Sequence, residues 1–129
     1  MLAELRVHVT LPVGDLDRAR AFYEGTLGFS PYNVQPTAVL YRAGEGTLFA
    51  ISKGTALSSG AHTQMAFTSH DLEADVAATR AQGVTFEEYD FPGFKTVGGI
   101  APVGPNRAAW FKDSEGNLIG IIQFADDSV

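Results

Sequence analysis

The sequence predicts an α+β fold made of two copies of one strand–helix–three-strand module, and three observations support this prediction. An alternating stretch from Leu5 to Val13 leads into an amphipathic segment that ends at Gly28. The same order returns half a chain later, where residues 63–68 lead into a segment that ends at Gly83. Each of these segments is followed by further strand-like stretches. A period of two residues is typical of a strand and a period near 3.6 of a helix.

Two pairs of short stretches align between the halves. Residues 9–16 align with residues 65–72, and residues 45–51 align with residues 115–121. Neither half is large enough to bury a sheet alone, so we expect the two modules to pair. The expected organisation is one domain, 1–129, with module one at about 4–53 and module two at about 62–125.

The elements of the first module follow from local signals. Leu5 to Val13 is expected as a strand whose odd positions face the helix, which leaves His8 on the opposite face. Asp15 is expected to cap the following helix, and Gly28 is placed as its left-handed stop. Three more strands are expected, at 29–32, 37–42 and 47–52.

The second module repeats these signals. Residues 62–68 are expected as a strand, Asp71 as a helix cap and Gly83 as the helix stop. The remaining expected strands are 84–89, 107–112 and 117–124. The segment 91–106 is rich in proline and glycine, and it is interpreted as a lid that includes Phe91, Phe94 and Val97 or as a long crossing loop.

Composition excludes several classes of function. The net charge of −6 disfavours nucleic acid as a partner, although an acidic surface mildly favours cationic small molecules. The absence of cysteine excludes disulfides and thiolate metal sites. No apolar run reaches the roughly 20 residues that span a bilayer, and the first residues lack the pattern expected of a leader peptide. The expectation is a cytoplasmic protein without a membrane partner.

The layout resembles the vicinal oxygen chelate superfamily, which includes glyoxalase I, extradiol dioxygenases, fosfomycin-resistance enzymes and bleomycin-binding proteins. The stretches that carry the resemblance are 13–16, 22–23, 27–29 and 110–117. The resemblance implies that the two βαβββ modules form a curled mixed sheet shaped as a cup. In the enzymes of the family a divalent metal lies at the floor of that cup.

Carried over to this sequence, the four metal-ligand positions of the family are His8, Ala50, Gln64 and Gly120. Ala50 and Gly120 have no donor atom, so both carboxylates are missing from the site. Hard divalent cations prefer oxygen ligands. We therefore expect no metal and no other cofactor.

The leading hypothesis is metal-independent binding of a small hydrophobic or aromatic molecule in the cup, for sequestration or resistance. The expected polar contacts are His8 and Gln64, and the expected apolar walls are Phe49, Trp110 and Tyr41. Trp110 is either a core residue or a stacking wall. The family further implies a homodimer. The alternative is a lyase, isomerase or dioxygenase with a degenerate metal site, or one that uses His8 as general base. A third possibility is a regulatory or structural domain whose cup is filled by its own side chains.

Overall fold

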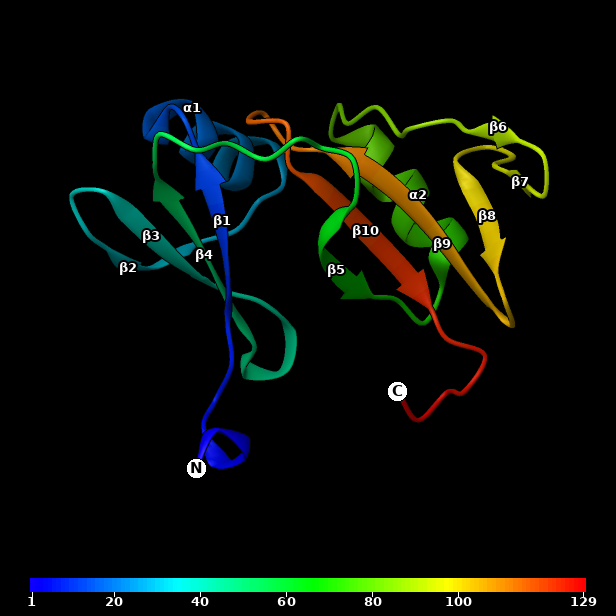
Figure 1. The fold of residues 1–129 in the computed structure, drawn as a ribbon, viewed down its shortest axis with the longest axis horizontal. Coiled ribbons are helices and arrows are strands. Elements are labelled where there is room, and N and C mark those ends of the chain that lie inside the picture. The colour runs from blue at the N-terminus through cyan, green and yellow to red at the C-terminus, as the bar shows by residue number, and fades with distance from the viewer. The chain divides into compact units, whose positions relative to one another are not determined.

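The computed structural model describes residues 1–129, which divide into two compact units, Met1–Ser58 and Ser59–Val129 (Figure 1). Each unit holds one four-stranded sheet and its own helix. None of the helices is long and apolar enough to cross a membrane.

Unit 1 has the order strand, helix, three strands. Its elements are β1 (Val9–Val13), α1 (Leu16–Arg20) running into a π-helical segment (Ala21–Thr26), β2 (Pro31–Val34), β3 (Ala38–Arg42) and β4 (Leu48–Lys53). The strand order is β1-β4-β3-β2, with β1 and β4 parallel. Two short 3-10 segments, Leu2–Glu4 and Gly44–Gly46, complete the unit.

Unit 2 repeats this order with one insertion. Its elements are β5 (Thr63–Thr68), α2 (Leu72–Ala81), β6 (Asp90–Phe91), β7 (Phe94–Lys95), β8 (Ile100–Val103), β9 (Asn106–Lys112) and β10 (Leu118–Gln123). The main sheet has the order β5-β10-β9-β8, and β6 and β7 form a separate hairpin.

The internal repeat extends to the register of the parallel strands. Val9 of β1 pairs with Phe49 of β4, and Met65 of β5 pairs with Ile119 of β10. These are the residues that the sequence alignment of the two halves makes equivalent. The predicted α+β fold of two βαβββ modules is confirmed.

Both predicted helix starts and stops are also confirmed. The side chain of Asp15 accepts a hydrogen bond from the Arg18 amide at 3.0 Å, and that of Asp71 accepts one from the Ala74 amide at 3.2 Å. Gly28 and Gly83 have φ angles of +83° and +102°. Only glycine adopts this left-handed backbone without a steric penalty, so each helix ends where glycine occurs.

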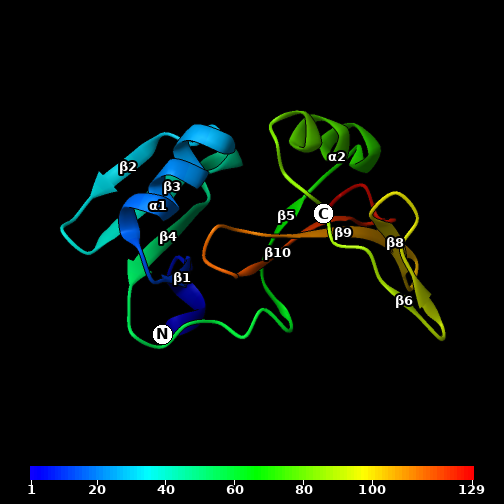
Figure 2. The same ribbon diagram turned by 90° about the horizontal axis from the view of Figure 1, so that it is seen from above.

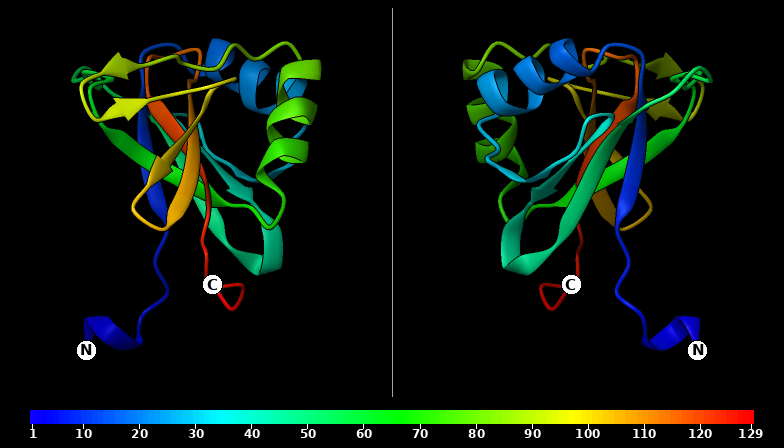
Figure 3. Two further views of the ribbon diagram at one scale, coloured as in Figure 1. Left: turned by 90° about the vertical axis from the view of Figure 1, so that its right-hand side faces the viewer. Right: turned by 90° about the vertical axis from the view of Figure 1, so that its left-hand side faces the viewer.

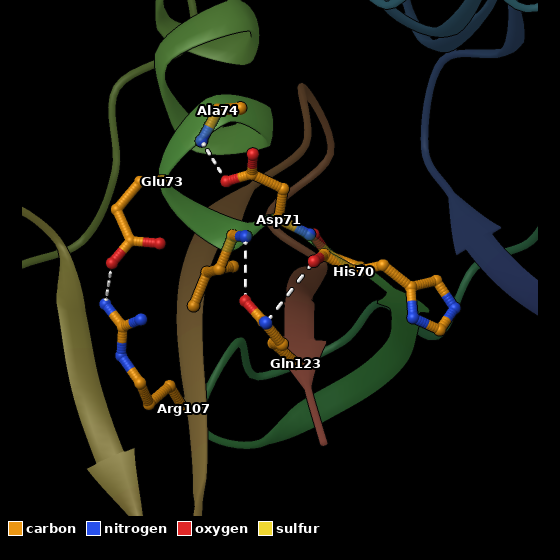
Figure 4. Close-up of polar contacts among 8 residues, drawn as sticks. His70, Asp71, Glu73, Ala74, Arg107 and Gln123 are labelled. Carbon is orange, nitrogen blue, oxygen red and sulfur yellow. Dashed lines mark hydrogen bonds and ion pairs between the residues drawn. The ribbon is translucent and has the colours of Figure 1, made fainter. Parts of the chain in front are cut away.

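The start of α2 is tied to two strands of its own sheet (Figure 4). Gln123 of β10 accepts a hydrogen bond from the Leu72 amide at 2.9 Å and donates one to the His70 carbonyl at 3.3 Å. Arg107 of β9 forms an ion pair with Glu73. The His70 side chain points away from this cluster. These contacts fix the helix to one face of the unit 2 sheet.

The helix-facing side of each sheet is apolar. In unit 1, Tyr23 of the helical segment lies against Tyr41 and Phe49, with ring centroids 5.9 and 5.5 Å away. In unit 2, the fully buried residues include Leu72 of α2 and Ile119 of β10. The two helices thus mark which face of each sheet is core.

The first strand is shorter than predicted, because β1 begins at Val9 and not at Leu5. Val7 is 85% exposed and does not face the helix. The partner strand β4 begins only at Leu48, after the 3-10 turn Gly44–Gly46, so residues 5–8 have no ladder to join. Arg6 instead donates a hydrogen bond to the Gly46 carbonyl.

The second strand of module two also lies elsewhere than predicted. Residues 84–89 make only an isolated bridge, between Phe86 and Phe111. The segment 91–106 is not one loop, because it supplies the second strand of the β6–β7 hairpin and the edge strand β8. All prolines and glycines of this segment occupy the turns between these strands, except Pro102, which lies within β8. Strands of two to four residues are too short to show a periodic pattern.

Candidate ligand-binding site

Four aromatic rings gather on the face of the unit 2 sheet opposite α2. Trp110 of β9 and Phe111 are neighbours in one strand, and Phe111 is buried on the helix side with Phe86. Trp110 therefore points to the other face, since side chains alternate along a strand. Figures 2 and 3 show α2 and the β6–β7 hairpin on opposite sides of this sheet. The hairpin brings the remaining rings to Trp110.

Three of the rings contact one another at inclined angles. Tyr89 and Trp110 have centroids 5.9 Å apart at 74°, Phe94 and Trp110 are 5.6 Å apart at 58°, and Tyr89 and Phe94 are 5.9 Å apart at 49°. Phe91 stacks on the outer side of Tyr89 and is 59% exposed. We call these four residues the Trp110 cluster. Each aromatic pair of this kind adds about 0.5–1.5 kcal/mol of stabilisation beyond that from the burial of apolar area.

The base of the hairpin is closed by a buried threonine. The Thr96 hydroxyl accepts a hydrogen bond from the Tyr89 amide at 2.8 Å and donates one to the Glu88 carboxylate at 2.5 Å. The Thr96 amide donates to the Tyr89 carbonyl at 2.9 Å. These bonds hold Tyr89 beside Trp110 while the turn at Pro92 and Gly93 extends outward.

The indole of Trp110 is positioned by a polar contact and lies beside a glycine. Its Nε1 donates to the Thr63 hydroxyl at 3.1 Å. Gly120 pairs with Trp110 across the ladder, and a Cβ there would lie 3.6 Å from Trp110 Cδ1 and 3.3 Å from Thr63 Cγ2. A side chain at Gly120 would crowd the Thr63 methyl group, whereas its contact with the indole would be an ordinary van der Waals contact.

Gln64 occupies an irregular position of β5. Thr63 pairs with Leu118 and Met65 pairs with the next residue, Ile119, so Gln64 is the extra residue of a bulge. Its Oε1 is buried and has no hydrogen-bond partner. Bulges are over-represented beside functional sites, and a buried acceptor without a partner is costly unless a ligand or water satisfies it.

Two charged residues border the Trp110 cluster. The Glu87 amide donates to the Trp110 carbonyl at 2.8 Å, which fixes the backbone of Glu87 beside that of Trp110. Lys112 Nζ lies 3.9 Å from Glu87 Oε1, beyond hydrogen-bond distance, and both side chains are partly exposed. Burial, with a smaller effect from the Glu87 charge, raises the pKa of Tyr89 above its ordinary value.

Two predicted wall residues lie in the core of unit 1. Tyr41 and Phe49 are 0% and 3% exposed and pair with each other across β3 and β4. Both rings pack on Tyr23, on the helix-facing side. This burial and packing make both residues part of the unit 1 core, and we do not include them in the ligand contacts proposed below.

Tyr41 is the polar end of that core. Its hydroxyl donates to Glu24 Oε2 at 2.8 Å, and Arg20 Nε donates to the same oxygen at 2.7 Å. The Arg20 hydrogen bond is the main reason that the pKa of Glu24 lies below its ordinary value. Burial, followed by the bond to Glu24, raises the pKa of Tyr41.

This network predicts a pH-dependent contribution to stability. A carboxyl whose pKa is lowered by folding stabilises the folded state above its unfolded pKa of about 4.3 and loses this contribution as the pH falls through the folded value. Glu24→Gln is therefore expected to lower the free energy of unfolding at neutral pH and to matter less under acid conditions. Urea unfolding of the original protein and the variant, at neutral pH and at a pH below about 4, measures the change in the free energy of unfolding. Glu45→Gln, which changes an exposed turn residue, is the control, and an equal loss at both pH values would contradict the prediction.

The family's metal positions do not supply a suitable donor set. Ala50 and Gly120 offer no donor, and their partners in the parallel ladders are Thr10 and Ala66. His8 precedes β1, is exposed, and has no hydrogen-bond or ion-pair partner within its unit. No group of three His, Asp or Glu side chains is arranged to hold a metal ion. A hard divalent cation is bound by several oxygen ligands, most of them anionic, so the residues at these four positions do not form a suitable metal site.

Sequence reasoning missed part of the site. Nothing in the sequence predicts a site role for Tyr89 or Thr63. Phe91 and Phe94 are predicted only as parts of a lid or crossing loop. The signal was the stretch Phe91-Pro92-Gly93-Phe94, since proline followed by glycine is typical of a tight turn and would pair the two flanking phenylalanines.

The whole fold is similar to several solved structures. TnmS3, an antibiotic binding protein from Streptomyces sp. CB03234, is 23% identical, with a TM-score of 0.71 over 97% of this chain and 99% of its own. FosX, a genomically encoded fosfomycin resistance protein from Listeria monocytogenes, is 18% identical, with a TM-score of 0.68 over 96% of each chain. A putative glyoxalase family protein from Bacillus anthracis is 15% identical, with a TM-score of 0.70 over 94% of this chain and 95% of its own. No curated protein matches the sequence.

The two βαβββ units give the chain its α+β fold, and the match of its sequence to a family model assigns it to a superfamily. Residues 6–121 match the Glyoxalase/Bleomycin resistance protein/Dioxygenase superfamily. The chain belongs to this superfamily.

Proposed function

We propose that this chain is a metal-independent small-molecule binding protein of the glyoxalase/bleomycin-resistance type. Its ligand is hydrophobic or aromatic and packs on the Trp110 cluster. The observation that carries the proposal is the gathering of Tyr89, Phe94 and Trp110 in mutual contact on the face opposite α2. Clustered rings with a few polar groups at their edge are typical of small-molecule sites.

Polar contacts in this proposal come from Gln64. Its partnerless Oε1 is an acceptor that a ligand N–H or O–H group would satisfy. His8 lies in the other unit, and its role as a polar contact stays a prediction. The homodimer expected from the family resemblance also stays a prediction.

Sequestration or resistance is the biological role that we propose for such binding. The support is the likeness to an antibiotic binding protein, which by itself shows a common fold. Metal independence is supported by the donor set, because Ala50 and Gly120 replace residues that would have to carry negative charge.

A ligand screen by thermal shift, with and without a chelator, tests the proposal. Aromatic compounds are expected to raise the melting temperature equally in both conditions, because binding to the folded state alone stabilises it. The screen is paired with elemental analysis of protein purified without chelators. Stoichiometric metal that disappears in His8→Ala would contradict metal independence, and a screen with no stabilising compound would contradict the binding function.

A further inference from the structure

We propose that the ligand of the Trp110 cluster carries a positive charge, as a planar aromatic cation or an alkylated ammonium. This inference rests on the proposed function and narrows its ligand class. Three features of unit 2 carry it: the mutual inclination of the rings, the carboxylate beside them, and the absence of a cation of the chain over them.

The ring geometry suits a cation. The face of an aromatic ring carries partial negative charge, and a cation within about 6 Å of the ring centre is attracted to it. Tyr89, Phe94 and Trp110 are inclined to one another by 49–74°, so their ring faces point in different directions and do not form one flat stack. A cation at the surface of this cluster can therefore lie over an outward ring face while it stays near the other rings.

Two other aromatic rings of the chain form cation–π contacts with arginines of the chain itself. The Arg42 guanidinium lies 4.3 Å from the Tyr32 ring centre, and that of Arg80 lies 5.3 Å from the Phe86 ring centre. No arginine or lysine of the chain lies over the rings of the Trp110 cluster in this way. That position is open to a cation from outside the chain.

The charges near the Trp110 cluster also favour a positively charged ligand. Glu87 is fixed beside Trp110 by its backbone hydrogen bond, and its charge acts on Tyr89. Lys112 is the opposing charge, but its Nζ lies 3.9 Å from Glu87 and its side chain is 49% exposed, so it can turn toward solvent. The net charge of −6 adds a long-range attraction for cations.

Trp110 provides the readout, because it is the only tryptophan and gives a single indole N–H signal in a proton–nitrogen correlation spectrum. Three probes of similar size are titrated: N-methylquinolinium, neutral quinoline at a pH well above its own pKa, and naphthalene sulfonate. N-methylquinolinium is expected to bind about fivefold or more tighter than quinoline. A smaller ratio, or tightest binding of the sulfonate, would overturn the cation inference and leave the proposed function standing. No shift with any probe would instead contradict the proposed function itself.

Two variants of opposite sign sharpen the test. Glu87→Gln is expected to weaken N-methylquinolinium binding about threefold, and Lys112→Gln is expected to tighten it, with quinoline unchanged in both. Both side chains are partly exposed, so the fold should tolerate either change. If neither variant alters the ratio of cation to neutral affinity, or if both change it in the same direction, the inference is wrong.

Discussion

Trp110→Ala is expected to lower the affinity for an aromatic ligand about 30-fold, because loss of a central tryptophan at a binding site costs about 2 kcal/mol or more. Trp110 is the ring that touches both Tyr89 and Phe94, so its removal also frees those two rings. Isothermal titration with N-methylquinolinium or quinoline measures the change without depending on the tryptophan signal.

Two further substitutions serve as controls for this result. Trp110→Phe keeps an aromatic face and should retain most of the affinity. Thr63→Val removes only the hydrogen bond to the indole, so it should give an intermediate loss. Unchanged affinity in Trp110→Ala, with the fold intact, would mean that the ligand does not use this cluster.

Phe49→Ala is expected to lower the free energy of unfolding by about 3–5 kcal/mol, the range for truncating a buried aromatic residue. The ring contacts Tyr23, Phe29 and Tyr41 with centroids 5.1–5.5 Å away, so its loss leaves a cavity at the centre of the unit 1 core. Denaturant unfolding followed by circular dichroism measures the change.

The same position separates a core role from a ligand-wall role. Phe49→Leu fills more of the cavity than alanine does, so it should fold and should bind aromatic ligands as the original protein does. A folded Phe49→Leu variant that no longer binds ligand would show that the ring contacts ligand after all.

The repeat could be predicted in detail because its signals are local. Asp15 and Asp71 cap helices through their own side chains, and Gly28 and Gly83 end them through their own backbone. Each signal acts within a few residues, so it does not depend on the rest of the fold. The equivalence of Val9 with Met65 is also local, and the two residues hold corresponding positions in the parallel ladders of the two units.

The errors lie where the outcome depends on distant residues. Residues 5–8 have the alternation of a strand, but a strand also needs a partner, and β4 does not extend to them. Residues 90–95 form strands of only two residues, which no periodic pattern can reveal, and their pairing is fixed by the turn at Pro92-Gly93 and by Thr96.

The sequence by itself determined the two modules, their helix limits and the loss of donor atoms at Ala50 and Gly120. It also pointed to Trp110 and Gln64 as residues of interest. Only the tertiary structure decided which aromatic rings are core and which meet on the opposite face. A strand such as β4, apolar on both sides, has two equivalent faces in sequence, and the packing of a helix against one of them makes the difference. That packing buried Phe49 and Tyr41, while the hairpin brought Tyr89 and Phe94 to Trp110.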